Sequence, residues 1–500
     1  MKLALVLAYF ACFTVLCLYG FHRARLVYLI WRHGKRIAGI AQTIALPDSQ
    51  LPTVTIQLPL YNEATVVGRL LDAVGKMDYP RDRFEVQVLD DSSDETRTIA
   101  ERKVAELRSQ GIDAVYVRRP DRVGYKAGAL DYGLQRAKGE FVAIFDADFI
   151  PQPGFLRSVV GNFRDPRVAV VQTRWEHLNR DLNLLTSVQA LMLDGHHMVE
   201  NRARCGAGFI WNFSGTGGIW RAAAIRDAGG WQHDTITEDL DLSYRAQLKG
   251  WRFVYRPDVL TPSELPEDMS AFREQQYRWA KGTVQTCRKL FAVVLSAKLT
   301  VAQKVEAFFH LTPHFAYPFI MGLTLLLLPT VAYMPAATWQ NMLLIDAPIT
   351  LATSGSLAFF YGLANVAQGR SLVAALVRLP ALIALNAGLS PNQTRAVWSG
   401  LRTMAGEFVR TPKKGNAAGR YWQAAQLPWV EMMLAVVCAV TVVTAVRAGH
   451  YFAAPFAGLF MVGYVYVSAL VITEQQALRR ALRESVPTPE VEDASIARAA

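Results

Sequence analysis

The chain has 500 residues, of which 52% are apolar, and a formal net charge of +11 at pH 7. This length is sufficient for a domain with a large core and a separate membrane portion. The basic residues gather beside long apolar runs, where attraction to anionic lipid explains them, and no helix-turn-helix or zinc-binding pattern accompanies them. We therefore expect membrane lipids, and not nucleic acid, as partners.

The chain begins with an uncharged apolar run, residues 3–20, that is long enough to span a bilayer. A cleaved signal peptide is the alternative, but no small-x-small cleavage site follows the run and the next segment is basic. By the positive-inside rule this basic flank stays in the cytoplasm. We expect a membrane helix with its flank over residues 1–36 and a soluble domain on the cytoplasmic side.

Residues 50–290 carry charges throughout and are typical of a soluble domain. Apolar or β-branched runs at 53–59, 84–89, 114–117 and 141–145 alternate with helical patterns at 66–77 and 96–110. This alternation predicts an α/β fold with a doubly wound, mostly parallel sheet. A dinucleotide-binding domain shares the alternation, but no G-x-G-x-x-G follows the first predicted strand.

Two acidic clusters follow predicted strands, Asp90-Asp91 and Asp146-x-Asp148. Carboxylates at the carboxyl ends of parallel strands point into the crevice where such sheets bind ligands. One or two carboxylates together with phosphate oxygens are a common site for Mg²⁺ or Mn²⁺. We expect Asp148 to bind the metal, with Asp146 beside it, and Asp90 and Asp91 to bind a nucleoside. Solvated turn acids are the alternative for either cluster alone.

Other residues near the strand ends complete a predicted nucleotide-sugar site. The first strand ends in a segment that contains Pro59, Tyr61 and Glu63, and Lys126 lies between two glycines where it could reach a base or phosphate. A solvated loop lysine is the alternative for Lys126. The glycine-rich segment with Phe213, Gly215 and Thr216 suits an acceptor pocket or simply a tight turn.

A second carboxylate pair, Glu238-Asp239, precedes a helical stretch. Direct transfer of a sugar with inversion needs one base that takes a proton from the attacking hydroxyl, and Asp239 is the expected base. Helix capping is the alternative. Farther on, Gln275-x-x-Arg278-Trp279 offers an amide, a planar cation for a diphosphate and a flat face for a sugar ring.

The rest of the chain, residues 291–475, is predicted to be a membrane portion. We expect apolar stretches at 311–333, 343–366, 429–446 and 452–472 to span the bilayer, which gives five spans in all. The stretch 372–389 contains Arg378 and Pro380 and is expected to be interfacial, because a span there would place the basic segment 402–420 outside. Residues 476–500 are expected to form a cytoplasmic tail, and five scattered cysteines suggest free thiols.

In combination, these motifs resemble the processive family 2 glycosyltransferases of the cellulose synthase superfamily, above all the cellulose-synthase-like mannan and glucan synthases and their bacterial relatives. The matching segments are residues 87–92, 124–130 and 142–149, with Gly215-Thr216, Trp220-Arg221, Glu238-Asp239 and Gln275-x-x-Arg278-Trp279. The resemblance covers about residues 52–290 closely and the membrane portion more loosely.

The resemblance implies a GT-A type domain that builds a β-linked glucan or mannan from UDP-glucose or GDP-mannose with Mg²⁺ or Mn²⁺. It also implies a gating loop, whose place is taken by residues 408–413, with Thr411 and Lys413 reaching the donor diphosphate and Arg410 departing from the family pattern. The tail is too short for the cyclic-di-GMP domain of bacterial cellulose synthases. We expect the membrane to be a bacterial inner membrane.

Two other functions are consistent with parts of the sequence. A non-processive enzyme that glycosylates a membrane lipid, such as diacylglycerol or ceramide, would use the same donor site. A catalytically silent transporter or scaffold is disfavoured because all the acidic residues and the Gln275-x-x-Arg278-Trp279 set are present.

Overall fold

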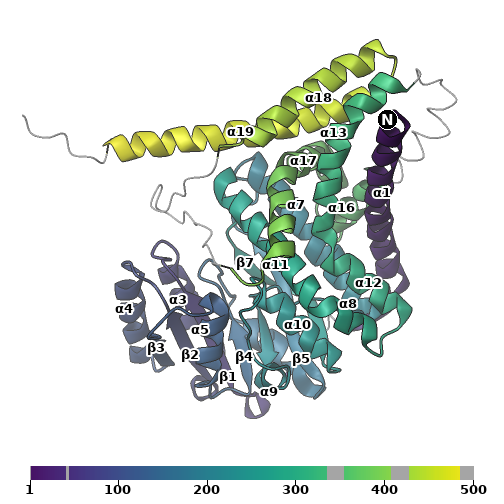
Figure 1. Cartoon of the computed structure of the whole chain (residues 1–500). Helices are drawn as coiled ribbons and strands as arrows, with labels where there is room; N and C mark the ends of the chain where they lie inside the picture. Colours follow the sequence, from purple (N-terminus) through teal and green to yellow (C-terminus); the bar gives the residue numbers. More distant parts are fainter. Residues whose placement is uncertain (1, 41–43, 335–353, 407–426, 485–500) are drawn as a thin grey trace, which may run out of the picture.

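The computed structural model describes residues 2–40, 44–334, 354–406 and 427–484. An α/β domain lies at one end of the molecule and long apolar helices lie at the other, with the N-terminus at the far end of the helical layer (Figure 1).

The α/β domain is built on one seven-stranded sheet with the order β3-β2-β1-β4-β6-β5-β7. β6 is antiparallel to both of its neighbours, and the other described pairs are parallel, as the alternating pattern predicted. The strands are β1 (Val54–Leu60), β2 (Phe84–Asp90), β3 (Asp113–Val117), β4 (Phe141–Ile144), β5 (Val168–His177), β6 (Gly218–Arg221) and β7 (Arg252–Ser263).

Helices cover both faces of this sheet, and the central strand β4 is apolar on both sides. Along β4, Phe141 and Ala143 enter one core cluster, whereas Val142 and Ile144 enter the other. The helices of the domain are α3 (Val67–Gly75), α4 (Thr96–Ser109), α5 (Tyr125–Leu134), α6 (Phe155–Val160), α7 (Leu184–Gly195), α8 (Arg202–Ala207), α9 (Ala222–Asp227), α10 (Glu238–Leu248), α11 (Met269–Ser296) and α12 (Val301–Leu311).

Five described helices are long and apolar enough to cross a membrane, so the chain is a membrane protein. They include α1 (Lys2–Arg32), α13 (Ala316–Tyr333), α17 (Leu372–Arg402), α18 (Trp429–Arg447) and α19 (Ala453–Glu484). Four of them coincide with predicted spans, whereas the fifth, α17, covers the stretch 372–389 that was predicted to be interfacial. Within the predicted span 343–366, the described part holds only the short helix α16 (Ser356–Val366), and α17 takes its place by length and composition.

Helix α17 extends 13 residues beyond the end of the predicted interfacial stretch and contains Pro380 and Pro391. Both of its ends contact the α/β domain and its extension α11. Near the first end, Arg378 lies 3.5 Å from Asp181, and at the second end Arg288 donates to the carbonyl of Gly400 at 2.9 Å. A helix that crosses a bilayer has its ends on opposite sides, so these contacts favour the interfacial interpretation over the one from length alone.

A buried ion network joins α1 to the domain. The carboxylate of Glu306 is fully buried and accepts bonds from Arg204 Nε and His22 Nε2, both at 3.0 Å, and from Arg25. Burial alone raises the pKa of a carboxyl group, but these partners outweigh it and lower the pKa of Glu306 to about 2. The first membrane helix is therefore fixed to the domain by charge as well as by packing.

Candidate active site

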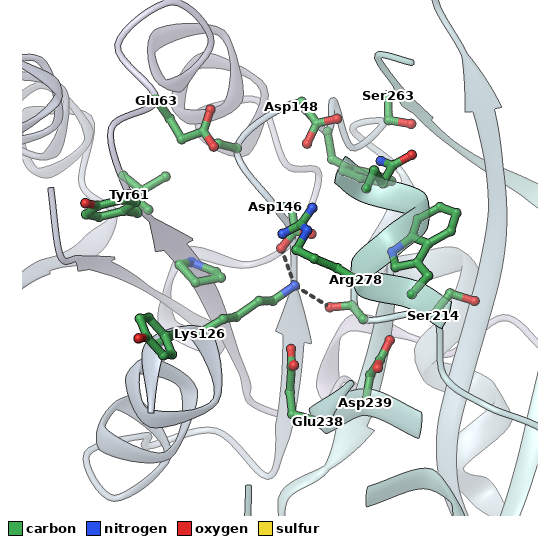
Figure 2. A pocket seen from close by; sticks show the side chains of 18 of the residues that line it. Tyr61, Glu63, Lys126, Asp146, Asp148, Ser214, Glu238, Asp239, Ser263 and Arg278 are labelled. Atoms are coloured by element: carbon green, nitrogen blue, oxygen red, sulfur yellow. Dashed lines mark hydrogen bonds and ion pairs between the residues drawn. The ribbon is translucent and has the colours of Figure 1, made fainter. Parts of the chain in front are cut away.

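Most of the predicted site residues line one cavity of about 220 Å³ at the carboxyl ends of β1 and β4. The start of α10 and one face of α11 close it from the other side (Figure 2). The predicted residues that line it are Pro59, Tyr61, Glu63, Asp91, Lys126, Asp146, Asp148, Gly215, Glu238, Asp239, Gln275, Arg278 and Trp279. Segments more than 200 residues apart therefore converge on one cavity.

Lys126 lies at the centre of the cavity (Figure 2). Its Nζ donates to Asp146 Oδ1 at 2.5 Å and to the carbonyl oxygen of Gly215 at 3.1 Å. Burial acts to lower the pKa of this ammonium, but the charges of Asp146 and Glu238 outweigh it and the net shift is upward. Lys126 is a buried cation held by carboxylates, which contradicts the interpretation as a solvated loop lysine.

Glu238 and Asp239 occupy the first turn of α10, and their side chains point toward Lys126 (Figure 2). Thr237 forms no side-chain capping bond, so the triplet is not a simple helix cap. Asp239 accepts the backbone N–H of Leu240 at 2.8 Å. Burial is the main cause that raises the pKa of both carboxyl groups, although Lys126 acts in the opposite direction. A carboxylate with a raised pKa is a better proton acceptor near neutral pH.

Gln275, Arg278 and Trp279 share one face of α11, since residues three and four apart lie on the same side of a helix. Burial lowers the pKa of the Arg278 guanidinium to about 10, so it remains a cation at neutral pH. Trp279 presents its indole to the same cavity. This face can hold an anion and a sugar ring side by side.

A loop between β3 and α5 forms the rim beside β1 and β2. Asp91 forms a two-pronged ion pair with Arg119, which includes a bond of 3.0 Å from Nε, and Arg119 also donates to the carbonyl oxygen of Tyr125. The guanidinium of Arg122 lies 3.3 Å from the ring centroid of Tyr61. The backbone of Tyr125 has a φ of 48°, a value that residues other than glycine rarely adopt. Such strained backbone conformations cluster at binding and catalytic sites.

Three predicted residues do not line the cavity. Asp90 is buried, and its carboxylate accepts hydrogen bonds from Tyr116 Oη at 2.7 Å and from the N–H of Ser92 at 2.9 Å. It therefore stabilises the end of β2 next to the cavity. Phe213 is fully buried against Trp220 in the core. Thr216 is also buried, and its hydroxyl accepts the backbone N–H of Asp146 at 2.9 Å.

Two further predicted residues, Thr411 and Lys413, lie outside the described residues. The cavity also contains residues that the sequence prediction missed, among them Arg122, Trp175 and Ser214. The Ser214 hydroxyl is buried and has no hydrogen-bond partner within the described part of the chain. Its position directly before Gly215 was the available signal.

The acidic side chains of the cavity could hold a divalent cation only in part. No group of three or more His, Cys, Asp or Glu side chains that could hold a metal ion occurs among the described residues. Asp146 and Asp148 both line the cavity, and two carboxylates are sufficient where Mg²⁺ is completed by substrate phosphates and water. The residues therefore fit a cation that binds together with a diphosphate, and not a preformed all-protein site.

The sequence of the chain is similar to those of known glycosyltransferases. The family model described as "Glycosyltransferase like family 2" matches residues 52–282. Glucomannan 4-beta-mannosyltransferase 2 of Arabidopsis thaliana is 43% identical over 266 residues, which are 52% of this chain and 50% of that protein. Probable glucomannan 4-beta-mannosyltransferase 10 of the same plant is 34% identical over 396 residues, 76% of this chain and 69% of that protein.

For several of these curated relatives, the match spans about half of their length. Among solved structures, the chain is similar to the mannosyltransferase PcManGT from Pyrobaculum calidifontis, described in complex with GDP-Man and Mn²⁺. The TM-score is 0.52 and the sequence identity 24%, over 76% of this chain and 98% of that one. At this identity the likeness establishes a shared fold.

Proposed function

Because the chain belongs to the family 2 glycosyltransferases, we propose that it extends a β-linked polysaccharide from a nucleoside diphosphate sugar, with inversion at the anomeric carbon. The observation that carries the proposal is the grouping of carboxylates and cations around one cavity. Asp146 and Asp148 lie on one side, Glu238 and Asp239 on another, and Lys126 lies between them. Such an arrangement has separate places for a charged leaving group and for a base.

The donor diphosphate would lie against Asp146, Asp148 and Lys126. Mg²⁺ or Mn²⁺ held by Asp148 with Asp146 would neutralise the charge of the leaving diphosphate when bound. Arg278, a buried cation on the opposite wall, would bind the same diphosphate. Tyr61, Arg122 and Asp91 at the rim would bind the nucleoside, with Pro59 and Glu63 beside them.

Asp239 would act as the base that takes the proton from the attacking hydroxyl. Its raised pKa near neutral pH suits this task, and Glu238 shares the same buried surroundings. The acceptor sugar would stack on Trp279, with Gly215 allowing close approach and Ser214 supplying a hydroxyl. Thr411 and Lys413 would also contact the donor diphosphate, as the resemblance to the family's gating loop implies.

GDP-mannose is the preferred donor in this proposal, and UDP-glucose is the second. The names of the relatives, which are glucomannan mannosyltransferases, support mannose. The growing polymer would leave through the membrane helices beside the cavity, with α17 lying along the membrane surface and the catalytic domain in the cytoplasm. The plant relatives give no support to a bacterial inner membrane as the location.

The test uses the purified full-length chain in nanodiscs with GDP-mannose and UDP-glucose in parallel. We expect GDP-mannose consumption and a chloroform-insoluble product that a β-mannanase digests. A short, chloroform-soluble glycolipid would support the alternative, sugar transfer to diacylglycerol or ceramide.

The role of Asp239 is tested by Asp239→Asn, which should abolish turnover and leave binding of GDP largely intact. The matched control is Asp234→Asn, because Asp234 is exposed, lies outside the cavity and undergoes the same chemical change. Unchanged transfer by Asp239→Asn would remove Asp239 from the role of base.

A further inference from the structure

A second cavity of about 280 Å³ lies between α7 of the catalytic domain and the segment that joins α16 to α17. Its charged lining consists of Arg180, Arg370 and Arg378 with one acid, Asp181. We call it the basic cavity. It shares no lining residue with the active-site cavity, so it needs an explanation of its own.

The arginines of the basic cavity differ in how far they are neutralised. Arg180 is nearly buried and forms a two-pronged pair with Asp194 at 2.6 and 2.9 Å. Arg370 has a bond of 3.1 Å to Glu176, and Arg378 lies 3.5 Å from Asp181. A guanidinium has five N–H donors, so both of these side chains, which are about one third exposed, retain donors for an anion.

The local backbone favours an anion as well. The basic cavity includes Ser371, the residue that caps the start of α17, and its side chain accepts the N–H of Ala374 at 3.3 Å. The start of a long helix carries partial positive charge, and its first N–H groups have no carbonyl partner within the helix. Two partly exposed guanidinium groups and a helix start therefore meet at one place.

The surroundings of the basic cavity are apolar and exposed. Val373 and Val377, in the first turns of α17, are 66% and 72% exposed, and Leu182 and Leu184, just before α7 and at its first position, are more than half exposed. A water-soluble anion would gain nothing from these side chains. An anionic lipid would use both features, because its phosphate needs the arginines and its acyl chains need an apolar surface.

We propose that the basic cavity binds the phosphate of an anionic phospholipid, whose acyl chains lie along the exposed apolar side chains at the start of α17. The site would anchor α17 to the same face of the membrane as α7. It does not depend on the proposed transferase reaction, and its test measures bound lipid.

The test is native mass spectrometry of the full-length chain released from nanodiscs that contain phosphatidylcholine and phosphatidylglycerol. We expect one retained phosphatidylglycerol in the wild type. The double variant Arg370→Gln/Arg378→Gln should bind it about 25-fold more weakly, since each arginine near the surface strengthens the attraction about fivefold. Arg102→Gln, which removes an exposed charge on α4 of the catalytic domain, is the matched control and should bind like the wild type.

Three outcomes would overturn the proposal. Equal retention by the double variant and the wild type would show that the lipid sits elsewhere. Equal retention of phosphatidylcholine and phosphatidylglycerol would show that the negative charge is not recognised. Displacement of the lipid by millimolar inorganic phosphate, with phosphate bound in its place, would identify a site for soluble anions. A photoreactive phosphatidylglycerol adds a positive readout, because it should label the first turns of α17.

Discussion

Replacing Lys126 with methionine should move the acid limb of the pH–activity profile upward by about two pH units. Burial raises the pKa of Asp239 to about 6 even though Lys126 acts to lower it. A Cβ placed on Gly215 would lie 3.0 Å from Asp239 Oδ2 and 3.7 Å from Lys126 Nζ. These two charged atoms are therefore no more than about 7 Å apart.

The magnitude follows from this separation. At about 7 Å and an effective dielectric constant of about 20, the attraction between the ammonium and the carboxylate is about 2.4 kcal/mol. Because one pKa unit corresponds to about 1.4 kcal/mol, loss of the cation should raise the pKa of Asp239 from about 6 to about 8. At pH 7 the ionised fraction of the base would fall from about nine tenths to about one tenth.

The assay is the pH dependence of kcat/KM for sugar transfer, which reports the ionisation of the free enzyme. At pH 7, the kcat/KM of Lys126→Met should be about tenfold lower than that of the wild type, in addition to any decrease caused by weaker donor binding. The tenfold decrease should disappear as the pH approaches 9, because the base is then ionised. Lys126→Arg keeps the charge and should keep its limb near pH 6. An acid limb that is the same in both variants would refute the electrostatic coupling of Lys126 to the base.

Three further outcomes are expected. EDTA should stop sugar transfer and Mg²⁺ or Mn²⁺ should restore it, so that metal-independent transfer would contradict the metal assignment. Gly215→Ala should lower kcat/KM about tenfold, because Gly215 has a φ of 79°, which costs other residues about 1–2 kcal/mol, and the new methyl would crowd Asp239. Glu306→Ala should lower the free energy of unfolding by about 3–5 kcal/mol, since the buried Arg204 keeps only Glu200 as a partner and His22 and Arg25 lose the carboxylate that they contact. In the same denaturation measurement, Glu140→Ala, which removes an exposed carboxylate, should lower the free energy of unfolding by less than about 1 kcal/mol. Equal decreases for the two variants would contradict the role of burial.

The fold of the catalytic domain was predictable because its strands and helices differ in period and in length. The run ending at Phe145 is apolar on both faces, as is typical of a strand in a covered parallel sheet, whereas the runs ending at Pro59 and Leu89 are apolar on one face and carry buried polar side chains such as Gln57 and Gln87 on the other. The last three strands, β5, β6 and β7, were not predicted, and the four residues of β6 follow glycines and carry no alternation of their own. The membrane portion was harder to predict. The length and composition of α17 are those of a membrane span, and only the contacts at its two ends favour an interfacial helix.

The limits of the site prediction follow from the geometry of a strand. Successive side chains of a strand point to opposite faces, so only one of two adjacent acids can face the crevice at its end. The sequence Asp90-Asp91 does not indicate which one, because the strand twists as it ends. The partners decide: Tyr116 on the neighbouring strand β3 holds Asp90 in the interior, whereas Arg119 in the loop after β3 holds Asp91 at the rim. Such partners come from the next strand in the sheet, and a motif of consecutive residues carries no information about them.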